Sequence, residues 1–106
     1  MARDCFAKIL SQTDANSYLE VPKSALYLPP SNSIIPVLDQ NGYVWEFKAP
    51  AKPSSGRRTL RGTWPQFAKT YFLRAGDAVK LSYDPNTNQY FVEFQKQIPA
   101  TLPLFV

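Results

Sequence analysis

The chain has 106 residues, which is enough for one domain built around one hydrophobic core. With 44% hydrophobic and 19% charged residues, its composition is that of a globular protein rather than a disordered one. Ten prolines against four glycines exclude a helical bundle, because prolines interrupt helices. The sequence has no histidine, which excludes His-assisted serine or cysteine triads, His-ligated zinc and the usual haem sites.

The net charge of +4 is unevenly distributed along the chain. Positions 47–76 contain no acidic residue and seven of the twelve basic ones, which are Lys48, Lys52, Arg57, Arg58, Arg61, Lys69 and Arg74. The remaining positions carry five basic and eight acidic residues, a net charge of −3. This separation favours an anionic partner on one face, and a solvated basic surface is the alternative explanation.

Cys5 is the single cysteine of the chain, so there is no disulfide framework, and a reducing compartment is expected. It lies in an apolar run and is predicted to be a small core residue rather than a nucleophile. No apolar stretch reaches membrane-spanning length, and the N-terminus has no signal-peptide pattern. We therefore expect a soluble, intracellular protein that does not enter a membrane.

Seven short extended segments are predicted, because apolar or alternating runs repeatedly end at turn-forming residues. In chain order they are residues 5–10, 18–21, 33–39, 43–48, 57–61, 78–83 and 89–95. Pro36 should confine the third segment to a sheet edge or a bulge, since proline has no amide hydrogen for the ladder. Asn41 and Gly42 form the clearest hairpin turn. The sixth segment predicts Val79, Leu81 and Tyr83 inward, with Lys80 and Ser82 outward.

Two short helical stretches are predicted, and residues 11–17 are predicted as a polar loop. Residues 23–28 can form one or two helical turns before Pro29 ends them. The second helix should begin at Thr63, where Thr63 and Gln66 have the spacing of a capping box, and end near Arg74 and Gly76. Its apolar face consists of Trp64, Phe67, Ala68 and Tyr71.

Seven short strands with two short helices predict a mainly β fold, either a small barrel or a sandwich. Residues 1–97 are expected to form the domain. The tail 98–106 is rich in apolar residues and proline, and it should either cover a barrel end or be the stub of a longer chain.

The sequence offers little for catalysis. Four of the five aspartates lie at predicted turns, where their side chains should cap backbone groups, and they are Asp14, Asp39, Asp77 and Asp84. No two carboxylates are spaced to share a proton, and no glycine-rich loop could hold a phosphate. We expect no enzyme, no metal site and no cofactor.

Residues 48–58 form the most informative segment. It contains four cations, two serines and a glycine, and Pro50 and Pro53 limit its freedom. Arginine can bind phosphate or guanine through two parallel hydrogen bonds, and serine hydroxyls and loop amides can reach phosphate oxygens. A mobile hairpin tip kept soluble by its charge is the alternative.

Taken in order, the sequence motifs resemble the plant B3 DNA-binding domain of auxin response factors, RAV-type and abscisic-acid-insensitive-type regulators and the reproductive-meristem group. The likeness spans about positions 5–96. The residues that carry it are Phe6 to Leu10 with Thr13 and Asp14, Leu19 to Lys23 with Ala25, Leu28 to Pro30, Asp39 with Gly42 to Phe47, Arg57 to Leu60, Gly62 to Trp64 with Phe67 and Ala68, and Leu73 to Val79. The Trp45-to-Trp64 spacing and the Leu-x-Ala-Gly-Asp-x-Val run are the most specific.

This resemblance implies a seven-stranded open β-barrel with two short α-helices, in which two loops grip the major groove of double-stranded DNA. Here the N-arm corresponds to residues 8–17 and the C-arm to residues 48–58. The implied DNA contacts in the N-arm are Lys8, Ser11, Gln12, Thr13 and Asn16. Those in and beside the C-arm are Lys48, Lys52, Ser54, Ser55, Arg57, Arg58 and Arg61. The resemblance also implies a transcriptional regulator of the plant nucleus, with further domains or dimerisation outside this chain.

Three alternatives stay open at this stage. A barrel of this kind could bind single-stranded nucleic acid through exposed aromatic side chains, although Trp45, Phe47, Trp64 and Phe67 lie on predicted core faces. It could also be a protein-interaction barrel that has lost duplex binding. The third alternative is the specificity module of a bacterial restriction endonuclease, which shares the fold.

Overall fold

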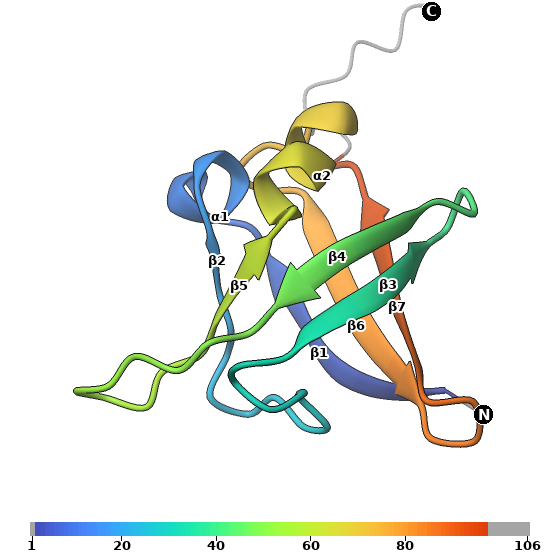
Figure 1. The fold of residues 1–106 in the computed structure, drawn as a ribbon. Helices are drawn as coiled ribbons and strands as arrows, with labels where there is room; N and C mark the ends of the chain where they lie inside the picture. The colour runs from blue at the N-terminus through green and yellow to red at the C-terminus, as the bar shows by residue number, and fades with distance from the viewer. Residues whose placement is uncertain (1, 98–106) are drawn as a thin grey trace, which may run out of the picture.

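The computed structural model describes residues 2–97, which form seven strands and two short helices (Figure 1). The strands are β1 Arg3–Ile9, β2 Leu19–Glu20, β3 Ile34–Asp39, β4 Val44–Lys48, β5 Thr59–Gly62, β6 Ala78–Asp84 and β7 Gln89–Gln95. The helices are α1 Gln12–Asn16 and α2 Trp64–Thr70. The predicted tail 98–106 lies outside the described residues. Across residues 2–97, no helix is long and apolar enough to cross a membrane.

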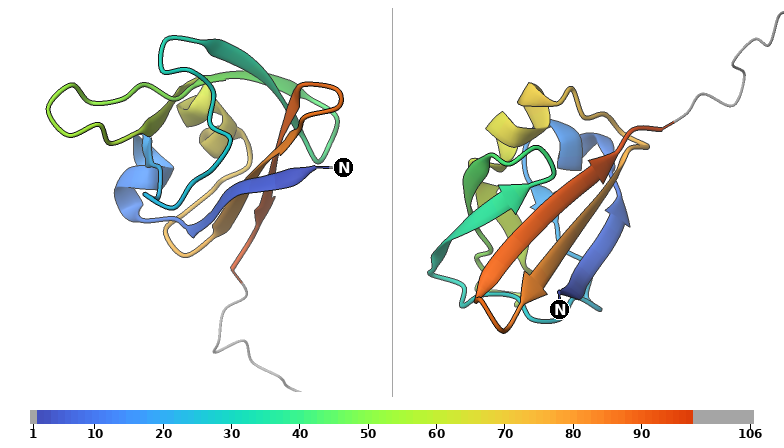
Figure 2. Two further views of the ribbon diagram at one scale, coloured as in Figure 1. Left: turned by 90° about the horizontal axis from the view of Figure 1, so that it is seen from below. Right: turned by 90° about the vertical axis from the view of Figure 1, so that its right-hand side faces the viewer.

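All seven strands belong to one sheet in the order β1-β6-β7-β3-β4-β5-β2. Neighbours are antiparallel except β3 and β7, which run parallel. The sheet curls around the core, and β1 and β2 are its two edges (Figures 1 and 2). The predicted mainly β, seven-stranded open barrel with two short α-helices is therefore confirmed.

A side chain spans the gap between the two edge strands. The Nζ of Lys8 on β1 donates to the Glu20 carbonyl of β2 at 2.7 Å, and it pairs with the Asp14 carboxylate at 2.9 Å. Strands β1 and β2 are not paired through their main chains, so Lys8 provides a side-chain link across the open side of the barrel.

The first predicted helix is in the wrong place. Residues 23–28 contain a turn and a bend but no helix, because Leu26 donates its amide to the Cys5 carbonyl of β1 and Tyr27 takes a positive φ of 58°. The helix lies instead in residues 11–17, which were predicted as a loop. There Ser11 and Asp14 form a capping box, each side chain accepting the other's backbone N–H.

The second predicted helix exists and begins as predicted, with Thr63 as its N-cap, but its predicted capping box is absent and it ends earlier than predicted. Thr63 makes no side-chain cap, because its hydroxyl bonds to the backbone of Glu46 on β4 instead. The helix ends at Thr70, where the Leu73 amide donates to the Ala68 carbonyl and Phe72 adopts a φ of 54°. This is a Schellman motif with phenylalanine in the left-handed position that glycine usually occupies.

Pro36 lies inside the sheet, not at an edge or in a bulge as predicted. Strand β3 has β4 on one side and β7 on the other, but its pairing with β7 begins only at Val37. The missing amide hydrogen of Pro36 therefore falls just outside that ladder.

Aromatic side chains fill the core. Phe47, Trp64 and Phe67 are completely buried and pack edge-to-face or tilted against one another at centroid distances of 5.4–5.9 Å. The predicted inward positions on β6 are confirmed for Val79 and Leu81, whereas Ser82, predicted outward, is buried. Tyr83 is half-buried.

Candidate nucleic-acid interface

The loop between β4 and β5 is an extension of the hairpin rather than a free coil. An isolated bridge joins Ala51 to Arg58, and the Lys52 amide donates to the Arg57 carbonyl at 2.8 Å. The Lys52 carbonyl then accepts the Gly56 amide at 2.7 Å, with Gly56 at a φ of 72°. The ribbon therefore projects from the barrel as an ordered arm (Figure 1).

Four cationic side chains lie on and beside this arm. Lys48 and Arg61 face each other across β4 and β5, and both are exposed. Like charges directly opposite on neighbouring strands are destabilising, so folding alone does not favour this pair. Lys52 and Arg57 extend the positive charge along the arm. Among residues 2–97, no hydrogen bond or ion pair holds the side chain of Lys48 or Arg57.

Tyr18, just before β2, and Glu20 within β2 are two residues of this region that the sequence prediction did not include. The Arg61 guanidinium carbon lies 4.4 Å from the centroid of the Tyr18 ring, and the Lys52 ammonium lies 5.8 Å from it. The Glu20 carboxylate is 3.9 Å from the Lys52 ammonium. Tyr18 and Glu20 are separated from Arg61 and Lys52 by more than thirty positions, and only the pairing of β2 with β5 brings them together.

Helix α1 is fixed next to this region by the completely buried Asp14. Although burial by itself raises the pKa of this carboxyl, the amides of Ser11 and Glu20 and the Lys8 ammonium hold the pKa below its ordinary value. The Trp64 indole also donates to the Asp14 carbonyl at 2.7 Å, which ties α1 to α2. The predicted N-arm residues that this helix and its cap expose are Ser11, Gln12, Thr13 and Asn16.

Two predicted DNA contacts have their side chains engaged inside the protein. Lys8 holds Asp14 and Glu20, and its side chain is only 24% exposed. The Arg58 guanidinium donates to the carbonyls of Ala49 and Pro29, which fixes the base of the arm to the preceding loop. These contacts give both residues a structural role. At the arm tip, Ser54 is exposed, and the Ser55 hydroxyl accepts the Arg57 amide at 3.3 Å.

The arm and α1 lie on the same side of the molecule, with β2 and β5 between them, in both Figure 1 and the left view of Figure 2. The exposed predicted residues of the N-arm and the C-arm thus share one side of the barrel. Strand β7 and the outer surface of β6 lie elsewhere on the barrel (Figure 2).

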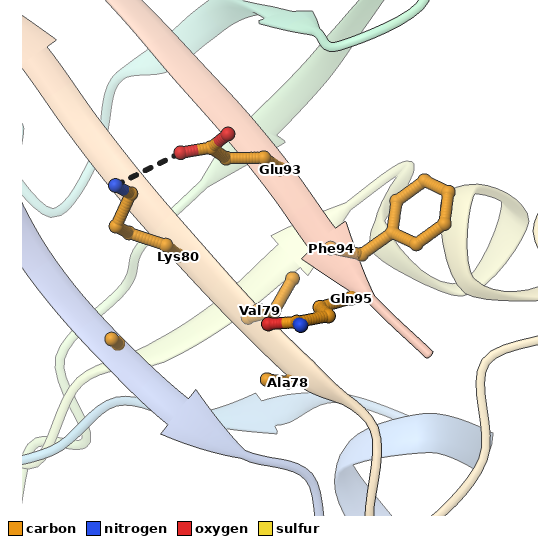
Figure 3. A pocket seen from close by; sticks show the side chains of 7 residues that line it. Ala78, Val79, Lys80, Glu93, Phe94 and Gln95 are labelled. Carbon is orange, nitrogen blue, oxygen red and sulfur yellow. Dashed lines mark ion pairs between the residues drawn. The ribbon is translucent and has the colours of Figure 1, made fainter. Parts of the chain in front are cut away.

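A second surface feature lies on the outer side of β1, β6 and β7. The small side chains of Ala7 and Ala78 leave a shallow hollow there, and Lys80 and Glu93 form an ion pair of 2.9 Å beside it (Figure 3). Within residues 2–97, no three carboxylate or thiol groups gather as a metal site requires.

The Asp39 carboxylate and the Cys5 thiol have structural roles. Asp39 accepts hydrogen bonds from the amides of Asn41 and Tyr43 and from the Trp45 indole. Burial raises the pKa of this carboxyl, but these donors and Tyr71 together hold it below the ordinary value. Cys5 is buried, and burial raises the pKa of its thiol to about 11, so the thiolate is not available at neutral pH. The predicted core role of Cys5 is confirmed.

Comparison with known proteins finds one family and several solved structures. The family model of the B3 DNA binding domain matches residues 6–98. The structure of the Arabidopsis FUS3–DNA complex superimposes with a TM-score of 0.78 and 26% identity, covering 91% of this chain and 100% of that one. No curated protein matches the sequence significantly.

Two further solved structures share the fold. A hypothetical Arabidopsis thaliana protein gives a TM-score of 0.69 at 20% identity, covering 92% of this chain and 93% of the other. The structure of the Arabidopsis thaliana transcription factor LEC2–DNA complex gives a TM-score of 0.65 at 18% identity, covering 89% of this chain and 94% of the other.

Proposed function

Because the chain belongs to the B3 DNA-binding domain family, we propose that it binds double-stranded DNA as the DNA-binding part of a plant transcriptional regulator. The FUS3 structure, similar over nearly the whole chain, was solved as a DNA complex. Membership in this family implies a binding protein rather than an enzyme. A regulator of this type acts in the nucleus, and domains or dimerisation outside this chain would set how it is arranged on DNA.

The observation that carries the proposal is the cluster of exposed cations on one side of the barrel. Lys48 and Arg61 lie opposite each other, and Lys52 and Arg57 continue the charge onto the arm. Cations at this density attract the phosphate backbone, and each phosphate that they neutralise releases counterions. Phosphate binding would also remove the repulsion between the opposed pair.

We propose that the C-arm and α1 enter or border the major groove together. The arm is an ordered two-stranded ribbon, and the major groove admits a ribbon of that width. Its ladder contacts and Pro53 reduce the conformational entropy lost on binding. The exposed polar side chains of α1, including Gln12 and Thr13, could then reach phosphates or base edges on the same side of the duplex.

The structure disfavours single-strand binding by stacking. Phe47, Trp64 and Phe67 are completely buried, so they cannot stack on bases. The large aromatic side chains exposed within residues 2–97 are Tyr27, Tyr43 and Phe72, and they lie on separate loops and turns rather than on one platform. A protein-interaction barrel is the other alternative that lacks duplex binding, and the following experiment separates it from our proposal.

The test is a salt titration of duplex binding. With four to six phosphate contacts, the logarithm of the affinity should fall against the logarithm of the salt concentration with a slope of about −4 to −5. The double variant Lys52→Ala/Arg57→Ala should weaken binding and make the slope shallower by about 2.

The control is the double variant Arg3→Ala/Lys80→Ala, which removes one arginine and one lysine from β1 and β6. It changes the net charge equally and should alter binding far less. Equal losses in both variants would show that only net charge matters. If the wild-type protein shifts no duplex at low ionic strength, or if it prefers single strands in competition, the proposed function is wrong.

A further inference from the structure

One acidic side chain lies among the cations of the proposed interface. Between residues 11 and 21 and between residues 49 and 62, the only acids are Asp14, which is buried, and Glu20. The Glu20 side chain is 46% exposed and belongs to β2, the strand that lies between α1 and the arm (Figure 1). A duplex bound to this side would therefore meet a carboxylate.

The backbone of Glu20 is held rigidly on both sides. Its amide donates to the Asp14 carboxylate at 3.0 Å, and its carbonyl accepts the Lys8 ammonium at 2.7 Å. The preceding residue, Leu19, is completely buried and pairs with Leu60 of β5. The carboxylate is thus presented from a fixed position, as a residue that reads a base edge requires.

A contribution to folding stability does not explain why a carboxylate occurs at position 20. Its partner, the Lys52 ammonium, lies 3.9 Å away, and both side chains are more than 40% exposed. Exposed ion pairs of this length contribute little to folding, because water screens them and both side chains lose freedom. On DNA the carboxylate would be repelled by phosphates, and Lys52 would have phosphate oxygens as competing partners.

A carboxylate in the major groove can be satisfied by one class of group, the amino donors on base edges. These are N4 of cytosine and N6 of adenine, and the other exposed polar atoms of the base edges are acceptors. In adenine the N7 acceptor lies beside the amino group and would repel a carboxylate oxygen. In cytosine no acceptor of the same base adjoins N4, so cytosine suits a carboxylate best.

We propose that Glu20 is a specificity-determining residue whose carboxylate accepts a hydrogen bond from a cytosine amino group in the major groove. The inference rests on the proposed duplex binding. The Glu20 carboxylate would be repelled by phosphates and by the oxygens of guanine and thymine. It would bind favourably only where a cytosine amino group lies within reach. The acid thus lowers affinity for most sequences and preserves it for those with cytosine at that position.

The test is a selection from a random duplex library by the wild-type protein and two variants, followed by affinity measurements on the selected duplex and its single-base changes. Glu20→Ala should lose a preference of about tenfold for cytosine at one position. Glu20→Gln should shift the preference there toward adenine, because glutamine matches the N6 and N7 of adenine. Thermal melting should show that both variants are folded.

The matched control is Glu93→Gln on β7, since Glu93 also forms an exposed ion pair with a lysine, at 2.9 Å from Lys80. It should leave every base preference unchanged. If both Glu20 variants bind all duplexes more tightly by the same factor, the carboxylate acts only by repulsion and the inference is wrong. Unchanged preferences, or a wild-type protein without any preference, would also overturn it. Failure of the wild-type protein to bind duplex at all would instead refute the proposed function.

Discussion

Replacing Asp14 by alanine should destabilise the domain more than any change of an exposed carboxylate. The side chain is completely buried and accepts from three donors, the Ser11 amide at 2.8 Å, the Glu20 amide at 3.0 Å and the Lys8 ammonium at 2.9 Å. The substitution removes the cap of α1 and leaves the Lys8 ammonium, which is mostly buried, without its counter-charge. Removing one partner of a buried ion pair costs about 3–5 kcal/mol. In a domain of this size, that lowers the Tm by more than about 10 °C.

The pH dependence provides an independent check of this reasoning. The pKa of Asp14 is held below its ordinary value in the folded protein, so the unfolded chain binds more protons as the pH falls. The contribution to stability is therefore complete above the unfolded pKa of about 4 and is lost as the pH falls through the lower folded value.

Urea unfolding of the wild-type protein and of Asp14→Ala between pH 3 and 7 measures this contribution. The difference in unfolding free energy should be constant above about pH 5 and shrink below pH 4. Asp4→Ala, at an exposed position of β1, serves as the control and should give a small difference at every pH. A loss of less than about 1 kcal/mol for Asp14→Ala at pH 7, or a difference that does not shrink in acid, would refute the role assigned to this carboxylate.

Three further predictions concern residues whose roles the structure defines. The Cys5 thiol should react with a chromogenic disulfide reagent only after unfolding, because burial raises its pKa to about 11; rapid reaction of the native protein would contradict this. Phe72→Asn should raise the free energy of unfolding by about 0.5–1 kcal/mol, since asparagine tolerates a φ of 54° better than phenylalanine does and the Phe72 side chain is 76% exposed. A lower Tm of this variant would show that the phenylalanine ring contributes to packing. Arg58→Lys should lower the free energy of unfolding by about 1–2 kcal/mol, because lysine cannot hold both the Ala49 and Pro29 carbonyls. Arg57→Lys is the control and should leave the Tm unchanged. Equal effects of the two variants on the Tm would argue against a structural role for Arg58.

The strands could be predicted from the sequence because their signals are local. Alternating side chains on β6 and the Asn41–Gly42 turn mark a strand and a hairpin wherever they occur in a chain. The apolar spacing of Trp64, Phe67 and Ala68 likewise predicted the buried face of α2. Helix α1 escaped prediction because five residues are too few for a periodic pattern, and its Ser-x-x-Asp cap resembles an ordinary polar turn.

Only part of the candidate interface could likewise be predicted from the sequence. The acid-free basic stretch marked the arm from composition alone, because charge is a property of single residues and needs no knowledge of contacts. Which of those cations remain exposed depended on tertiary contacts. Arg58 and Arg57 are neighbours in sequence, yet only Arg58 meets backbone carbonyls from another loop.

The sequence by itself determined a mainly β fold of short strands, one cationic stretch and the absence of a histidine-based active site. Its local patterns left a barrel and a sandwich both open, and the open barrel was implied by the resemblance to the B3 family. Only the tertiary structure decided that Lys8 bridges the open edge of the barrel and that Tyr18 and Glu20 join Arg61 and Lys52. The physical reason is that strand pairing brings together residues from distant positions, and the register of β2 on β5 is set by the burial of Leu19 and Leu60 rather than by any local signal.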